Sequence, residues 1–202
     1  YDGNAYNIAL GFAAGTTVTT GQGNTLLGSL AGYNLQAGNN NVAIGMNAMG
    51  TAAAGGCNIA IGITAMEGGL VTGLNNVAIG TNTAAGLTTG ACNVAIGKSA
   101  LVAATCGDKN VAIGANAMDA SNATSNYNTV VGASAGSGIT TGDLNVLIGY
   151  VAGCNAEVHL TTESNMISLG NNTTTNFYVS AALSNPSDCR DKTDVTDLDL
   201  GL

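Results

Sequence analysis

The sequence predicts an all-β fold, a parallel β-solenoid of about nine to ten coils with a period of 17 or 18 residues. The first observation is a five-residue pattern of Asn, three apolar residues and Gly, as in Asn41-Val-Ala-Ile-Gly45. The second is its spacing, because successive copies lie 17 or 18 residues apart until a final interval of 20. A fixed short period is typical of solenoids, in which each copy is one coil stacked on the last. An elongated rod is therefore expected, and most enzyme folds are excluded.

The Asn that opens each copy is expected to belong to a structural ladder along the rod. Asn bonds turn backbone and tolerates left-handed backbone angles, and stacked Asn side chains can bond one another. A role in sugar binding is less favoured, because a ladder that runs through the whole rod is more simply structural. The expected ladder consists of Asn7, Asn24, Asn41, Asn58, Asn76, Asn93, Asn110, Asn128 and Asn145, and a stretched copy, Asn165-Met-Ile-Ser-Leu-Gly170, ends the series.

The three apolar residues of each copy predict a short strand with a large and a small apolar face. Val and Ile lie two apart and share one face, while the Ala between them points the other way. We expect Val and Ile to fill the coil and Ala to line a close contact with another copy of the chain. A small residue three positions after the Gly, usually Ala, fits the same steric limit. The closing Gly is expected in a turn conformation that a Cβ would forbid.

Sulfur-containing residues are expected inside the coils. Met46, Met49, Met66 and Met118 fit as gap-fillers in an uneven core. Among the five Cys residues, Cys57 and Cys92 directly precede ladder Asn residues two coils apart, roughly 10 Å, which is too far for a disulfide. We therefore expect small buried Cys side chains in a protein assembled under reducing conditions.

Composition limits the partners of the chain. Charged residues are 8% of the sequence, against roughly 25% in typical soluble domains. A net charge of −8 with four Lys and Arg argues against nucleic acid, because phosphate binding needs clustered cations. The apolar runs are too short for membrane insertion. A single coil encloses little volume, so we expect an intertwined or side-by-side homotrimer, with each chain bound to two further copies of itself.

No metal site or cofactor is predicted. The single His, His159, could meet two other copies on a trimer axis and bind a metal, but a surface His is the favoured interpretation.

The repeat Asn-Val-Ala-Ile-Gly-x-x-Ala resembles the head repeat of trimeric autotransporter adhesins, which form a left-handed parallel β-roll in a trimer. The resemblance covers about residues 4–155 and implies a structural or adhesive β-roll over residues 1–155, with no catalytic residues to carry over. The period is longer than the family's usual one, near fourteen residues, and we attribute the extra residues to loops rich in Thr and Gly.

The end of the chain has a different composition. Residues 156–186 are expected to form a β-rich cap or neck, because an open solenoid end exposes core and unpaired strand edges. After the only Pro, Pro186, the string Ser187-Asp-Cys-Arg-Asp-Lys192 resembles the opening of the endosialidase-type intramolecular chaperone domain of phage tail fibres and tailspikes. The resemblance implies that residues 187–202 begin this domain, which drives trimerisation and then cuts itself off before Ser187. Ser187 and Lys192 would form the dyad, since a Lys with a lowered pKa can accept the Ser proton.

Together these resemblances imply a structural fibre segment of a tailed bacteriophage, trimeric, that supports or forms a host-receptor-binding surface. Its expected location is the virion, after assembly in the host cytoplasm. Its expected partners are two further copies, other tail or virion proteins, and a host-surface glycan or protein. No enzymatic activity is expected beyond the one-time self-cleavage. The alternative is the head of a bacterial trimeric surface adhesin, which an upstream signal peptide and a downstream anchored stalk would favour.

Overall fold

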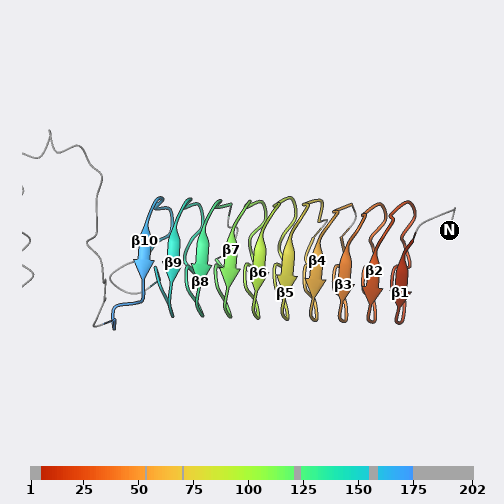
Figure 1. The fold of residues 1–202 in the computed structure, drawn as a ribbon, viewed down its shortest axis with the longest axis horizontal. Coiled ribbons are helices and arrows are strands. Elements are labelled where there is room, and N and C mark those ends of the chain that lie inside the picture. The colour runs from red at the N-terminus through yellow and green to blue at the C-terminus, as the bar shows by residue number, and fades with distance from the viewer. Residues whose placement is uncertain (1–5, 53, 70, 121–123, 155–158, 175–202) are drawn as a thin grey trace, which may run out of the picture.

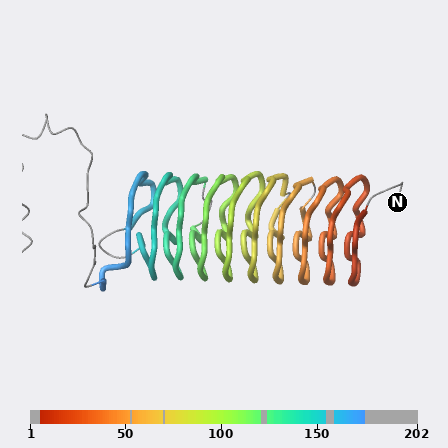
Figure 2. The backbone as a smooth tube through the Cα atoms, in the orientation of Figure 1, coloured from red at the N-terminus to blue at the C-terminus, as the bar shows by residue number. Residues whose placement is uncertain are grey.

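The computed structural model describes residues 6–52, 54–69, 71–120, 124–154 and 159–174. These residues form a rod in which ten three-residue strands lie side by side in chain order (Figure 1). The chain winds through one coil between each strand and the next, for about nine turns (Figure 2). The strands are β1 (Ile8–Leu10), β2 (Thr25–Leu27), β3 (Val42–Ile44), β4 (Ile59–Ile61), β5 (Val77–Ile79), β6 (Val94–Ile96), β7 (Val111–Ile113), β8 (Thr129–Val131), β9 (Val146–Ile148) and β10 (Ile167–Leu169).

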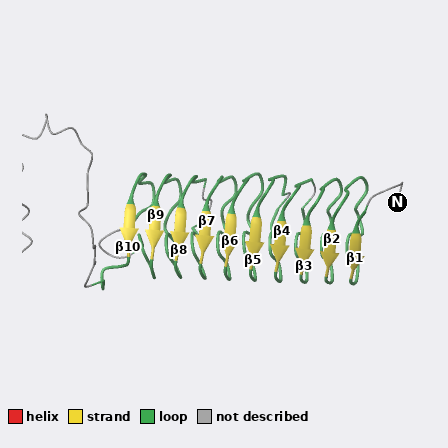
Figure 3. Cartoon of the chain, in the orientation of Figure 1, coloured by secondary structure: helices red, strands yellow, loops and turns green. Residues whose placement is uncertain are grey.

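All ten strands pair in parallel and in phase with the sequence repeat. Val42 pairs with Ile59, Ala43 with Ala60 and Ile44 with Ile61, and the same register recurs from β1 to β10. The strands make one continuous sheet, and the rest of each coil is turn and loop (Figure 3). The structure thus confirms the predicted all-β parallel β-solenoid.

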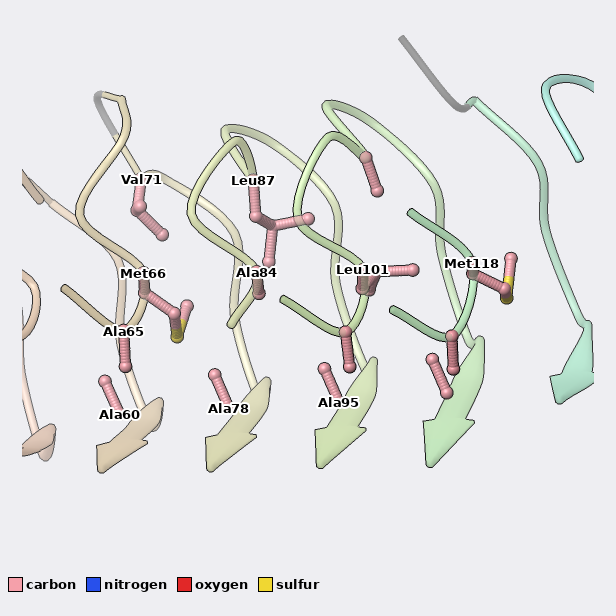
Figure 4. Packing of buried hydrophobic residues seen from close by; sticks show 14 of the residues in the cluster. Ala60, Ala65, Met66, Val71, Ala78, Ala84, Leu87, Ala95, Leu101 and Met118 are labelled. Carbon is pink, nitrogen blue, oxygen red and sulfur yellow. The ribbon is translucent and has the colours of Figure 1, made fainter. Parts of the chain in front are cut away.

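The prediction for the two strand faces was wrong. The central Ala of the strand is inside the coil, as in Ala60 at 0% exposure, whereas the flanking Val and Ile point outward. The physical reason is the width of the coil: the chain turns back after the strand, and Ala65 faces Ala60 across the interior (Figure 4). The small residue after the Gly therefore meets a steric limit within one chain.

The closing Gly residues have the predicted turn conformation, and they also stack on one another. Gly45 has a φ of 127°, and a Cβ on it would lie 2.5 Å from the carbonyl oxygen of Gly62 in the next coil. A side chain is excluded by both the backbone angle and the neighbouring coil.

Larger apolar residues fill the part of the coil away from the strand. Met66 and Val71 fill one coil, Leu87 the next and Leu101 the one after (Figure 4). The prediction of buried Met is confirmed for three of four residues, Met49, Met66 and Met118. It was wrong for Met46, which follows the stacked Gly45 and is 52% exposed.

The last described strand, β10, lies within the 156–186 segment. It pairs with β9 through Ile167 opposite Val146, so the parallel sheet continues past residue 155. This register gives Met166, not Asn165, the place that Asn holds in the other copies. The extra residues of the longer last coil lie before β10, outside the strand.

Candidate functional site

The outward face of the sheet carries a continuous band of apolar side chains. We call the first and third residues of strands β1–β10 the apolar stripe. Most are half-buried, and Ile79 and Ile148 are 37% and 45% exposed. None of the residues of the ten described strands is charged. At the first positions of β2 and β8, Thr25 and Thr129 replace Val or Ile.

The size of the stripe is comparable to the largest apolar patches of ordinary proteins. Nine steps of about 4.8 Å and columns about 7 Å apart give a footprint of about 300 Å² between the two columns alone. The largest apolar patch on a typical monomer is roughly 300–600 Å² and is often functional. The stripe carries no charged residue, on a chain with 8% charged residues.

The Asn ladder lies inside the coil, directly beneath the start of each strand, and holds the stripe in register. Asn93 donates from Nδ2 to the carbonyl oxygen of Gly107 in its own coil, at 2.7 Å. Its Oδ1 accepts the backbone N–H of Asn110 at 2.9 Å and the Asn110 side-chain amide at 3.2 Å. One side chain therefore closes its own coil and binds the next. Asn24 to Asn145 are buried in this way, and Asn7 at the N-terminal end is half-buried.

The ladder stops at β10. Asn145 donates to the carbonyl oxygen of Glu163 at 2.8 Å and accepts the backbone N–H of Met166 at 2.8 Å. Because the Met166 side chain cannot donate an amide hydrogen, no further rung follows it in the described residues.

A second, more exposed ladder was missed by sequence reasoning. Asp108 Oδ1 accepts the backbone N–H of Ala91 at 2.7 Å, and Asp143 Oδ1 accepts that of Asn126 at 2.6 Å. Asn126 in turn accepts from Asp108 N–H at 2.9 Å. The available signal was an Asn or Asp two residues before a ladder Asn. Because several coils have Gly, Ala or Leu there, this pattern is less regular than the main ladder.

The cysteine prediction needs correction. Cys57, Cys92 and Cys106 are exposed and Cys154 is half-buried, and all four are free. Cys57 and Cys92 have left-handed φ values of 56° and 60°, in the turn that enters the strand, so their side chains lie outside the coil. Side-chain hydrogen bonds from Thr89 and Thr105 lower the pKa of the Cys106 thiol.

The corresponding turn of the next coil carries a cationic contact. Lys109, one coil further on, donates from Nζ to the Tyr127 hydroxyl at 2.9 Å and lies 4.7 Å from the centre of that ring. Hydrogen bonding to Tyr127 raises the pKa of Lys109. This contact joins two successive coils on the surface.

Several predicted site residues lie apart from the stripe. His159 is exposed and pairs with Cys154 in an isolated antiparallel bridge. In the part of the chain that the structure describes, no three His, Cys, Asp or Glu residues gather as a metal site would require. Ser187 and Lys192 lie outside the described residues. The described segments contain no helix with the length and apolarity to cross a bilayer.

No protein-family model, no curated protein sequence and no solved structure matches this chain.

Proposed function

We propose that the chain is a rod-shaped structural segment that assembles with two further copies of itself along the apolar stripe. The observation that supports this proposal is the orientation of the strands, with Ala inside and the larger Val and Ile outside. Exposure of this band to water is unfavourable, because the burial of apolar surface contributes about 25 cal/mol of free energy per Å². Self-association would cover it without any further protein.

The resemblance of the repeat to the heads of trimeric autotransporter adhesins favours three copies over two. A dimer through the stripe would bury about 600 Å² in total, two contributions of about 300 Å², which is within the range of adventitious contacts. A trimer would bury about 900 Å² in total, divided among three contacts, so residues that flank the stripe must enlarge each contact toward the lower limit of about 1,000 Å² for a specific interface. A closed three-fold arrangement also lets each narrow sheet contact both neighbours.

The biological setting is a fibre segment of a tailed bacteriophage that supports or forms a host-receptor-binding surface. This part of the proposal rests on the resemblance of the Ser187–Lys192 string to the start of the intramolecular chaperone domain. Other tail or virion proteins, and a host-surface glycan or protein, would be its further partners, and the virion its location. The repeat itself equally supports the alternative, the head of a bacterial trimeric surface adhesin.

The assembly is tested by the mass of the protein in solution. For the 202-residue chain, sedimentation velocity and light scattering should give three times the chain mass of 19.7 kDa. Ile61→Glu and Ile96→Glu place a charge in the middle of the stripe and should yield monomers. Thr141→Glu, on an exposed loop outside the stripe, is the matched control and should remain trimeric. A monomeric wild-type chain with a folded circular dichroism spectrum would contradict the proposal.

A further inference from the structure

The regular repeat creates a problem for any assembly of these rods. Neighbouring coils present nearly the same outward residues, so one copy could slide by a strand, about 4.8 Å, against another and keep most of the apolar contact. A staggered contact of this kind does not close, and repeated staggering generates an open filament. A closed assembly therefore needs a feature that distinguishes one level of the stripe from another.

Thr25 and Thr129 are the polar residues of the apolar stripe. Both are half-buried, with Ile8 and Val42 beside Thr25 and Val111 and Val146 beside Thr129 in the paired strands. Their backbone amides donate to Asn41 and Asn145, each at 2.8 Å. Neither hydroxyl has a hydrogen-bond partner among the residues that the structure describes. Because Thr has nearly the shape of Val, packing within the chain does not account for the hydroxyl.

We infer that Thr25 and Thr129 set the axial register between copies in the proposed trimer. This inference rests on the proposed association through the stripe. When the copies are level, the three Thr25 side chains meet at one height and the three Thr129 side chains at another. Each hydroxyl is both donor and acceptor, so three of them can bond one another.

A stagger removes this pairing. Displacement by one strand sets each Thr hydroxyl against Val or Ile, where a buried hydroxyl loses its water and finds no partner. The two levels are six strands apart, in β2 and β8, so displacement by six strands matches one level only and leaves most of the sheet uncovered. Among parallel arrangements, only the one in which the copies are not displaced along the rod satisfies both Thr layers and covers the whole stripe.

The sharpest test moves one Thr of the stripe to the neighbouring strand without changing the amino-acid composition. The variant Thr25→Val/Val42→Thr moves a hydroxyl from β2 to β3, and it should form trimers with itself as the wild type does. The variant is refolded together with heavy-isotope-labelled wild-type chain, and native mass spectrometry counts the mixed trimers. We expect mixed trimers to be about tenfold below the binomial yield of random mixing, because their Thr layers do not match. Thr141→Val, which removes a hydroxyl outside the stripe, should mix at random.

A second variant tests closure directly. Thr25→Val/Thr129→Val makes the stripe uniformly apolar, so the chain should still associate, with an increased fraction of species above the trimer mass. If the swapped chain mixes at random and the double Val variant remains strictly trimeric, the register inference is overturned while the trimer stands. If the wild-type chain does not associate at all, the proposed assembly fails and the inference fails with it.

Discussion

Leu147 occupies the space that Gly153 leaves open across the same coil. A Cβ on Gly153 would lie 2.8 Å from Leu147 Cδ1, and Gly153 has a left-handed φ of 72°. Leu26 and Gly32 repeat the arrangement near the other end of the rod, with 2.7 Å between Leu26 Cδ2 and the added Cβ. Where the strand instead carries Ala60, the residue at the turn position of Gly153 is the large Met66, although Ala84 has this position in the coil of Ala78. In these coils a large side chain on the strand is matched by Gly in the turn, and Ala on the strand leaves room for a large side chain in the turn.

This exchange predicts a compensating pair of substitutions. Leu147→Ala alone should lower the free energy of unfolding by about 2–5 kcal/mol, as large-to-small changes in buried cores do. Gly153→Met alone should also destabilise, because its side chain meets Leu147. The double variant recreates the Ala and Met combination of the coil that contains Ala60, so it should recover at least about 1 kcal/mol relative to the sum of the single effects. Urea unfolding of the four proteins measures this coupling, and strictly additive losses would show that the two positions do not share one space.

The Asn ladder predicts a large cost for losing one rung. Asn93→Ala leaves the Gly107 carbonyl and the Asn110 N–H without their partners inside the coil. Each buried group that loses its partner costs about 1–3 kcal/mol, so a total loss of about 2–5 kcal/mol in the free energy of unfolding is expected. Gln22→Ala removes an exposed amide and is the control, with an expected change within about 0.5 kcal/mol. Chemical denaturation gives both values, and equal effects would contradict the structural role of the ladder.

Strand positions, parallel stacking and the Asn column could all be predicted from sequence, because they follow from the period alone. The direction of the faces also had a usable signal, since Asn93 lies two residues before Ala95 and an inward ladder requires an inward Ala. The exchange between Leu147 and Gly153 could not be predicted, because it depends on which turn residue faces the strand. That Met166 takes the place expected for Asn165 could not be predicted, because the last coil differs in length from the others.

We expect acid to lower the stability of the end of the ladder at Glu163. Its carboxylate Oε2 accepts the backbone N–H groups of Thr161 at 2.7 Å and Thr162 at 3.0 Å, and the bond from Thr161 lowers the pKa of Glu163. A carboxyl whose folded pKa is below its unfolded pKa stabilises the fold above the unfolded pKa, and this stabilisation is lost as pH falls through the folded value. Glu163→Gln should therefore lower the thermal midpoint at pH 7, and the difference from wild type should close as pH falls through the lowered folded pKa. A difference that does not vary with pH would contradict this role.

The pH dependence of stability from Asp119 should be opposite to that from Glu163, so Asp119 serves as the control for Glu163. Burial raises the pKa of the Asp119 carboxyl, so its charged form opposes folding at neutral pH. Stability from this group should increase as pH falls from the raised folded pKa toward the unfolded pKa. Asp119→Asn is then expected to raise the thermal midpoint at pH 7 and to lose this advantage in acid. A midpoint lower than that of the wild type at pH 7 would show that the carboxylate has a stabilising partner instead.

The chaperone resemblance predicts one cut in the product of the full-length parent gene. Denatured intact mass should show a chain that ends at Pro186, because the Ser187 hydroxyl, activated by Lys192, would act on the bond that precedes it. Ser187→Ala and Lys192→Met should each leave the parent chain whole, and Ser184→Ala, three residues upstream, should be cut as in the wild type. A single uncut wild-type chain would remove Ser187 and Lys192 from the proposed chemistry and shift the balance toward a bacterial surface adhesin. It would leave the proposed trimer untouched, since the apolar stripe is independent of residues 187–202.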